Sequence, residues 1–239
     1  MSNQNRTFSG GAIDRNKAIN FIFNGKKYKG FQGDTLASAL LANDVHLVGR
    51  SFKYHRPRGI LTAGSEEPNA LIQLGIGART EPNIRATEIE LYEGLEAESQ
   101  NCWPSVDFDI GEANNLLSRL FPAGFYYKTF KWPPSLWLFY EHFIRKAAGL
   151  GESPKAKNPD RYEQRFHYCD VMIVGGGVSG LTAALAAARA KCDVLLVDEN
   201  PYFGGYLSDS SASINGKNIS DWIRIVLDEL KSYENVKLL

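Results

Sequence analysis

Three glycines, Gly175, Gly177 and Gly180, follow the spacing Gly-x-Gly-x-x-Gly and are the residues best suited to hold a ligand. In this spacing the first glycine permits a tight turn, the second lets the backbone approach a pyrophosphate, and the third lets a helix pack closely on a strand. Val178 and Ser179 lie where that helix is expected to begin, where free N–H groups and the positive dipole end attract phosphate. The motif predicts a dinucleotide site, and it indicates no catalytic residue and no metal ligand.

The segments around these glycines have the order that a dinucleotide-binding unit requires. Asp170–Val174 is predicted to be a short strand, and Ser179–Ala190 a helix with six alanines that can lie close to a sheet. A second predicted strand, Asp193–Asp198, ends in an acid 18 residues after Gly180. A carboxylate at that place accepts hydrogen bonds from ribose hydroxyls. The alternative, a glycine-rich turn with a purely structural role, accounts for fewer of these features.

The residues after the second predicted strand bear on which dinucleotide binds. Asp198 and Glu199 are acidic and no arginine follows them directly, which disfavours a 2′-phosphate and hence NADP. The motif itself does not choose between the remaining two cofactors; NAD is our prediction and FAD the alternative at the same place. Gly204 and Gly205 form a second glycine turn, which either passes near the cofactor or is an ordinary loop.

The predicted nucleotide unit has fewer strands than its fold class requires. After Asp198 the pattern predicts one more helix, near 219–232, and the start of a third strand in "NVKLL". A doubly wound sheet has five or six strands, and a shorter one leaves exposed edges. We therefore expect these 239 residues to be the N-terminal part of a longer polypeptide, and to be inactive alone.

Composition excludes several classes of function. Lysine plus arginine and aspartate plus glutamate number 27 each, so no general attraction to nucleic acid or to an anionic membrane is expected. The N-terminus has no apolar signal region, and no uncharged apolar run is long enough to span a bilayer. The cysteines, Cys102, Cys169 and Cys192, are widely spaced and odd in number, which favours reduced, buried thiols and a cytoplasmic location.

The chain divides into four predicted parts. Residues 1–17 form an N-terminal arm, 18–95 a compact α+β domain, 96–166 an aromatic-rich helical connector with a polar linker, and 167–239 the truncated α/β nucleotide domain. We find no internal repeat.

Turn and capping residues predict the elements of the α+β domain. Asn24-Gly25, between two apolar-alternating runs, is typical of a β-hairpin. Asp34 or Thr35 is expected to cap a helix that starts at Leu36. Later strands are predicted at 70–77 and 86–94.

Two further segments are unusual. The connector, with dense aromatics from Trp103 to Trp137 and helices expected near 111–120 and 134–148, is typical of a core or an interface rather than a ligand cage. The stretch Arg50 to Arg58 clusters basic residues around His55. It is either a contact for an anion or an acidic partner or, as we favour, an internal ion-pair network.

The segments "SFKYHRPRG", "AGSEEPNAL" and "FYYKTFKWP" resemble the N-terminus of the alpha subunits of bacterial heterotetrameric sarcosine oxidases. The resemblance extends over nearly the whole chain. It implies that residues 18–95 are a ferredoxin-like β-grasp domain and that the last domain is of the Rossmann type. In relatives that keep a [2Fe-2S] cluster the loop "TAGSEEPNAL" carries cysteines; here it has none, and a cluster needs four thiolates, so we expect no iron–sulfur cluster.

The resemblance also implies a function. It points to a multi-subunit flavoenzyme, with beta, gamma and delta subunits, that oxidises the CH–NH bond of sarcosine to give glycine and formaldehyde or methylene-tetrahydrofolate. NAD would bind at the glycine motif of this chain, while FMN and FAD are expected in the complete complex. Two alternatives stay open: a subunit of a related secondary-amine or opine dehydrogenase or cyanide-forming enzyme, and a non-catalytic assembly module.

Overall fold

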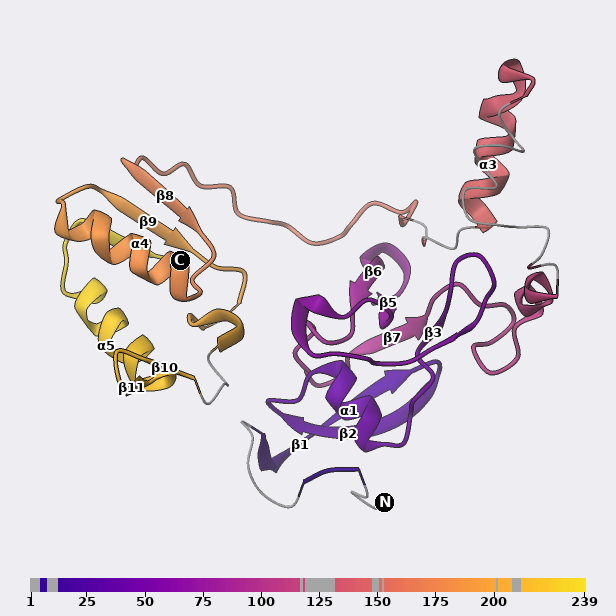
Figure 1. The fold of residues 1–239 in the computed structure, drawn as a ribbon, viewed down its shortest axis with the longest axis horizontal. Coiled ribbons are helices and arrows are strands. Elements are labelled where there is room, and N and C mark those ends of the chain that lie inside the picture. The colour runs from indigo at the N-terminus through magenta and orange to yellow at the C-terminus, as the bar shows by residue number, and fades with distance from the viewer. Residues whose placement is uncertain are drawn as a thin grey trace. The chain divides into compact units, whose positions relative to one another are not determined.

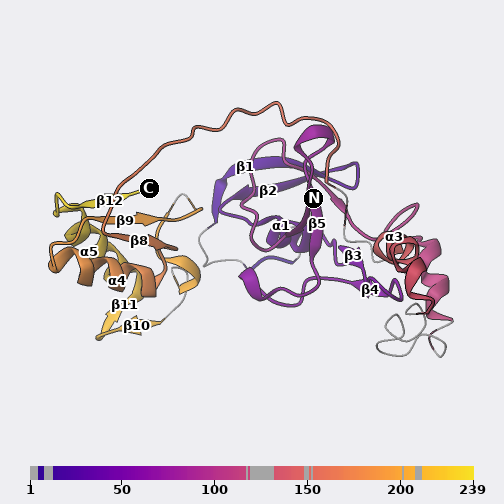
Figure 2. The same cartoon turned by 90° about the horizontal axis from the view of Figure 1, so that it is seen from above.

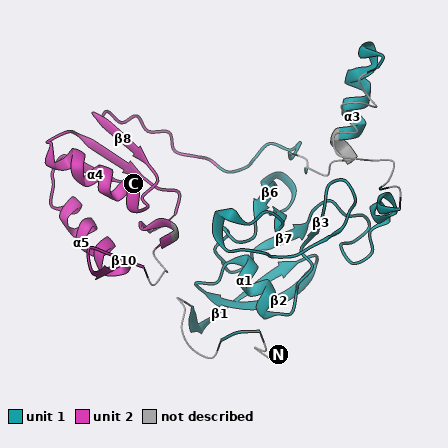
Figure 3. Ribbon diagram, in the orientation of Figure 1, with its two compact units in different colours: residues 1–160 teal, residues 161–239 magenta. Residues whose placement is uncertain are grey.

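The computed structural model describes residues 5–7, 13–116, 118, 132–147, 151, 153–200, 202–207 and 212–239. The chain forms two compact units, residues 1–160 and residues 161–239 (Figure 3). Among the described residues, no helix combines the length and apolar character needed to cross a bilayer.

The first unit is built on a mixed sheet of five strands in the order β2-β1-β7-β5-β6 (Figure 1). These strands are β1 (Asp14–Phe23), β2 (Lys26–Gln32), β5 (Leu71–Leu74), β6 (Glu81–Arg85) and β7 (Glu96–Ser99). β1 pairs with β2 antiparallel and with β7 parallel. The ferredoxin-like α+β prediction agrees with this architecture, although β1 begins within the segment expected to be an arm.

The hairpin and the capped helix form as the sequence predicts. Asn24 and Gly25 have φ angles of 50° and 71°, so both central residues of the turn occupy the left-handed region that Asn-Gly favours. Helix α1 (Leu36–Ala42) starts after Thr35, whose hydroxyl accepts the Ser38 N–H in a capping box. The buried face of α1 packs on the sheet against apolar side chains of β1, β5 and β7.

The strand predicted at 86–94 is wrong. The structure has β6 before this segment and β7 after it, with only an isolated bridge between Thr35 and Glu90. Its backbone serves the start of α1 instead, because the Ile89 carbonyl accepts the Leu36 N–H at 2.8 Å and the Leu91 N–H donates to the Asp34 carbonyl at 2.8 Å. The apolar residues of this segment, Ala86, Ile89 and Leu91, pack in the core cluster of the first unit without forming a strand.

The first unit has seven further elements besides its sheet and α1 among the described residues. They are β3 (Gly49–Arg50), β4 (Pro57–Arg58), the 3₁₀ turns η1 (Gly64–Glu66), η2 (Gly77–Arg79), η3 (Ile110–Asn115) and η4 (Pro134–Leu136), and helix α3 (Trp137–Ala147). The helix expected near 134–148 is therefore present from η4 onward. The one expected near 111–120 is a 3₁₀ turn in its described part, and residues 117, 119 and 120 lie outside the described residues.

Apart from the half-buried Tyr140, the described aromatic side chains of the connector are exposed. Trp103, Trp132 and Phe139 are 69%, 81% and 61% exposed. These three side chains therefore lie outside the core that the described residues form, and their role in an interface stays a prediction.

The second unit is a parallel sheet of three strands in the order β12-β9-β8 (Figure 2). The strands are β8 (Val171–Val174), β9 (Val194–Val197) and β12 (Val236–Leu238), and the helices are α4 (Val178–Arg189) and α5 (Ile219–Lys231). Apolar side chains of both helices pack with those of β8, β9 and β12 in one cluster. The remaining elements are η5 (Gly205–Leu207) and the hairpin β10 (Ser213–Ile214) to β11 (Lys217–Asn218).

Candidate functional site: a glycine-lined dinucleotide cradle

The first glycine turn has the strained geometry that its sequence predicts. Gly175, directly after β8, has φ +98°, a backbone conformation that residues other than glycine rarely adopt. Its N–H donates to the Val197 carbonyl at 2.8 Å, which ties the turn to the end of β9. A Cβ on Gly180 would overlap the Gly175 carbonyl oxygen, so Gly180 is required for the close approach of helix and turn.

Gly177 is different, because its Cβ position is open. The nearest atom to that position is the Gly205 Cα, 4.0 Å away, so the fold itself would accept a side chain there. Gly177 is also the N-cap of α4, and the first intrahelical bond runs from the Leu181 N–H to the Gly177 carbonyl at 2.9 Å. The N–H groups of Val178 and Ser179 precede that bond, in the turn where the helix dipole favours an anion. The open space beside Gly177, the N–H donors and the positive end of the helix dipole together suit a pyrophosphate.

Asp198 lies directly after β9, beside the glycine turn. Its Oδ2 accepts the Gly176 N–H at 2.6 Å, and its Oδ1 accepts the backbone N–H and the side-chain amide of Asn200, both at 2.9 Å. Burial raises the pKa of the Asp198 carboxyl, but these hydrogen bonds outweigh it and the pKa is lowered overall. Asp198 is thus held as a carboxylate where the sequence expects a ribose to bind.

The second glycine turn lies against the first. The Gly204 N–H donates to the Gly176 carbonyl at 2.9 Å, and a Cβ on Gly205, whose φ is +59°, would come within 3.0 Å of the Gly177 Cα. The second turn thus contacts the first, as the alternative in which it passes near the cofactor requires. Glu199 is exposed next to Asp198.

Sequence reasoning missed three residues of this arrangement. They are Gly176, whose N–H holds Asp198; Asn200, which holds the other carboxylate oxygen; and Phe203, whose ring lies where a Cβ on Gly176 would be. The middle glycine of "GGG" and an asparagine two residues after the acid were visible signals for the first two. The position of the Phe203 ring depends on tertiary packing.

Two residues of the basic stretch, Arg50 and His55, take part in an internal network of the kind we favoured, whereas Arg56 and Arg58 are exposed. The guanidinium of Arg50, 4% exposed, pairs with Glu112 at 3.0 Å and donates to the carbonyls of Val106 and His55. His55 Nδ1 lies 2.6 Å from an oxygen of the buried Asp109 carboxylate. These contacts tie β3 and the β3–β4 loop to η3 and the segment before it.

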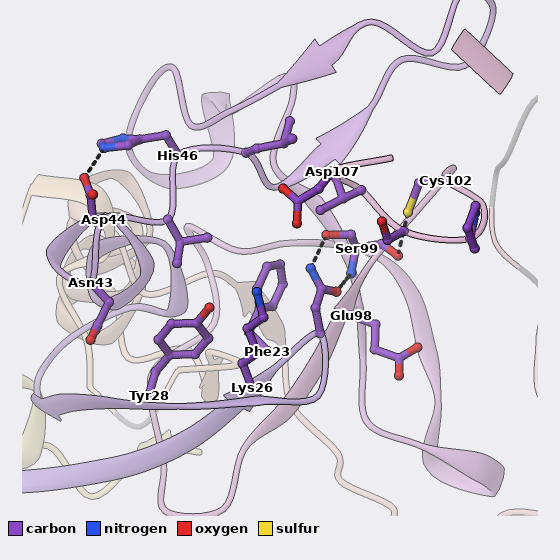
Figure 4. A pocket seen from close by; sticks show the side chains of 16 residues that line it. Phe23, Lys26, Tyr28, Asn43, Asp44, His46, Glu98, Ser99, Cys102 and Asp107 are labelled. Carbon is purple, nitrogen blue, oxygen red and sulfur yellow. Dashed lines mark hydrogen bonds and ion pairs between the residues drawn. The ribbon is translucent and has the colours of Figure 1, made fainter. Parts of the chain in front are cut away.

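A cleft of about 910 Å³ also opens in the first unit, between the β1–β2 hairpin, the loop after α1 and the segment after β7 (Figure 4). Its charged residues are of both signs, among them Lys26, Glu98 and Asp107. Asp44 and His46 on its rim are paired with each other at 2.9 Å. This mixed lining singles out no class of ligand.

The three cysteines are free, as expected, but they are only partly buried, whereas we expected buried thiols. Burial and the nearby Asp109 carboxylate raise the pKa of the Cys102 thiol to about 11. Within the described part of the chain, no three His, Cys, Asp or Glu side chains gather in a way that could hold a metal ion.

Comparison with known families places both units. Residues 16–102 match the family model described as "2Fe-2S iron-sulfur cluster binding domain", and residues 170–233 match the one described as "FAD dependent oxidoreductase". In the solved structures, L-proline dehydrogenase from P. horikoshii is similar in fold, with a TM-score of 0.50 at 20% identity over 94% of this chain and 33% of the dehydrogenase.

Curated relatives extend the match to nearly the whole chain. Sarcosine oxidase subunit alpha of Rhizobium meliloti (strain 1021) is 57% identical over 96% of this chain and 23% of the relative. The subunit of the same name from Corynebacterium sp. (strain U-96) is 32% identical over 95% of this chain and 19% of the relative. The chain thus shows strong homology to these subunits, and it spans about a fifth to a quarter of their length.

Proposed function

We propose, from the homology to sarcosine oxidase subunit alpha, that this chain is the N-terminal, dinucleotide-binding part of the alpha subunit of a sarcosine-oxidising flavoenzyme. The observation that carries the proposal is the open position beside Gly177, at the N-terminus of α4 and next to the second glycine turn. Asp198 is hydrogen-bonded to the neighbouring Gly176. These groups are suited to the adenosine diphosphate half that NAD and FAD share. The catalytic chemistry belongs to the complete complex.

Each part of the cradle has a separate role in this proposal. The N–H groups in the first turn of α4 would hold the pyrophosphate, and the Asp198 carboxylate would accept the ribose hydroxyls. The bound cofactor would supply a redox ring that accepts a pair of electrons from the substrate or from another cofactor. The match to an FAD-dependent family supports a flavin, and the sequence resemblance supports NAD.

The identity of the dinucleotide can be tested directly on the complete complex. Cofactors released from it by denaturation would be separated by chromatography, and NAD binding to the intact complex would be measured by titration. FAD or NAD assigned to the cradle should be lost in a variant of the glycine motif while cofactors at other sites remain. If both remain, the cradle is not a dinucleotide site.

The amine substrate requires an assay of the full enzyme. We expect the complex to turn over sarcosine, with glycine and formaldehyde or, with tetrahydrofolate, methylene-tetrahydrofolate as products. N-methylglutamate and opines are the comparison substrates for the related secondary-amine dehydrogenases. Turnover of one of these with none of sarcosine would replace the proposal by that alternative.

We expect Asp198→Ala to weaken dinucleotide binding by about 1–3 kcal/mol, because it removes a charged acceptor for the ribose hydroxyls. The dissociation constant would be measured by calorimetry on the complex. Asp193→Ala, at the opposite end of β9, is the matched control, since Asp193 is exposed and far along the strand from the glycine turn. Equal affinities of the two variants would remove Asp198 from the site.

A second role, docking onto other subunits, is supported by the exposed aromatic residues of the connector. Leu138, Phe139 and Phe143 of α3 are 81%, 61% and 57% exposed, more apolar surface than one short helix normally leaves in water. We expect Phe139→Glu to reduce co-purification of this chain with its partner subunits. Leu61→Glu, at an equally exposed apolar residue outside the connector, should not. Undiminished assembly of the Phe139 variant would exclude α3 from the interface.

A further inference from the structure

A buried carboxylate organises the loop between β4 and β5. Glu67 is 1% exposed, yet its side chain makes no ion pair among the described residues. Its Oε2 accepts the N–H groups of Leu61 and Thr62 at 2.7 and 2.6 Å. Its Oε1 accepts those of Asn69 and Ala70 at 2.7 and 3.2 Å. Four backbone donors from both ends of the loop thus converge on one anion.

Converging backbone N–H groups form concavities that bind anions, among them phosphates and iron–sulfur clusters. The family matched by residues 16–102 is described as binding a 2Fe-2S cluster, and this loop lies inside that range. The donor set for such a cluster is missing, because four thiolates are required and residues 16–102 contain one cysteine, Cys102.

We propose that the Glu67 carboxylate takes the place of an iron–sulfur cluster as the anion around which the 61–70 loop folds. The loop then needs no metal, and this unit relays no electrons. A side chain of the protein itself satisfies the amides that would otherwise face an external anion, so the loop is ordered as soon as the chain folds. The proposal is independent of the dinucleotide site, which lies in the other unit.

Reconstitution tests the first part of this proposal. The purified chain would be incubated anaerobically with ferrous iron, sulfide and thiol, then desalted and examined for iron, acid-labile sulfide and visible absorption. We expect the spectrum of the protein alone. A stoichiometric cluster with the absorption of a 2Fe-2S centre would overturn the proposal, whatever the behaviour of any Glu67 variant.

Substitution tests the second part. Glu67→Gln keeps the size of the side chain but presents an NH₂ group to one of the two pairs of amides, so we expect the melting temperature of the first unit to fall by about 5 °C or more. Glu66→Gln is the matched control: Glu66 is the exposed neighbour, and its substitution should change the melting temperature by less than about 2 °C. Equal melting temperatures of the two variants would refute the role of Glu67.

The pH dependence of stability distinguishes the contribution of the Glu67 charge from that of the shape of its side chain. Burial raises the pKa of this carboxyl, but the four N–H bonds outweigh it and lower the pKa overall. Its contribution to stability is therefore complete above the pKa of an unfolded glutamate, about 4.3, and is lost as the pH falls through the lower pKa of the folded state. The difference between wild type and Glu67→Gln should shrink over that acid range. A constant difference from pH 7 to pH 3 would contradict the anion role.

Discussion

Gly177→Val is expected to abolish dinucleotide binding, raising the dissociation constant more than about 100-fold, while the second unit stays folded. The physical reason is that the valine side chain would project into the open space beside the N-terminus of α4, where the pyrophosphate is proposed to lie. The fold has room for a Cβ at this position, since no atom is nearer than 4.0 Å. Binding would be measured by calorimetry with NAD and with FAD, and folding by circular dichroism.

Two other substitutions on the same helix serve as controls for this result. Ala183→Val adds bulk to an exposed position of α4 and should leave binding unchanged. Gly180→Ala should instead destabilise the unit itself, because its Cβ would overlap the Gly175 carbonyl oxygen. Wild-type affinity in a folded Gly177→Val protein would mean that the motif is only a structural turn.

The glycine motif could be predicted from the sequence because its constraints are local. The φ of Gly175 and the contact of Gly180 with Gly175 arise within six residues of chain, so any sequence that folds as strand, turn and helix must meet them. The same holds for the Asn24-Gly25 hairpin and for the Thr35 cap, where neighbouring residues decide the backbone conformation. Residue type and spacing are then sufficient evidence.

Features that depend on distant contacts could not be predicted. Residues 86–94 alternate like a strand, but their backbone bonds to the start of α1, and only the folded chain brings the two together. Glu67 and Glu66 look alike in the sequence, although one is buried and the other exposed. The contact of the second glycine turn with Gly176 likewise joins residues 28 positions apart, so the sequence alone does not indicate it.

Arg50→Met is expected to destabilise the first unit by about 3 kcal/mol. Methionine retains much of the apolar stem but none of the donors, so the Val106 and His55 carbonyls and the Glu112 carboxylate lose a charged partner that is 4% exposed. Hydrogen exchange in the 239-residue chain would measure the effect. In peptides covering residues 49–58 and 102–115, exchange should accelerate about 100-fold, since each tenfold change corresponds to about 1.4 kcal/mol. Peptides from α4, in the other unit, should not change.

Arg56→Met is the matched control, and it also decides between the two interpretations of the basic stretch. Arg56 is exposed, with its Nε 3.2 Å from the Asn115 side-chain oxygen, so its loss should change stability by no more than about 0.5 kcal/mol. An internal network requires that Arg50→Met destabilise the unit and Arg56→Met not. A contact for an acidic partner predicts a different outcome: both variants would stay as stable as wild type, and both would bind the partner subunits less tightly. The loss of binding would vanish at high salt because exposed charges are screened. The burial of Arg50 makes the first outcome the expected one.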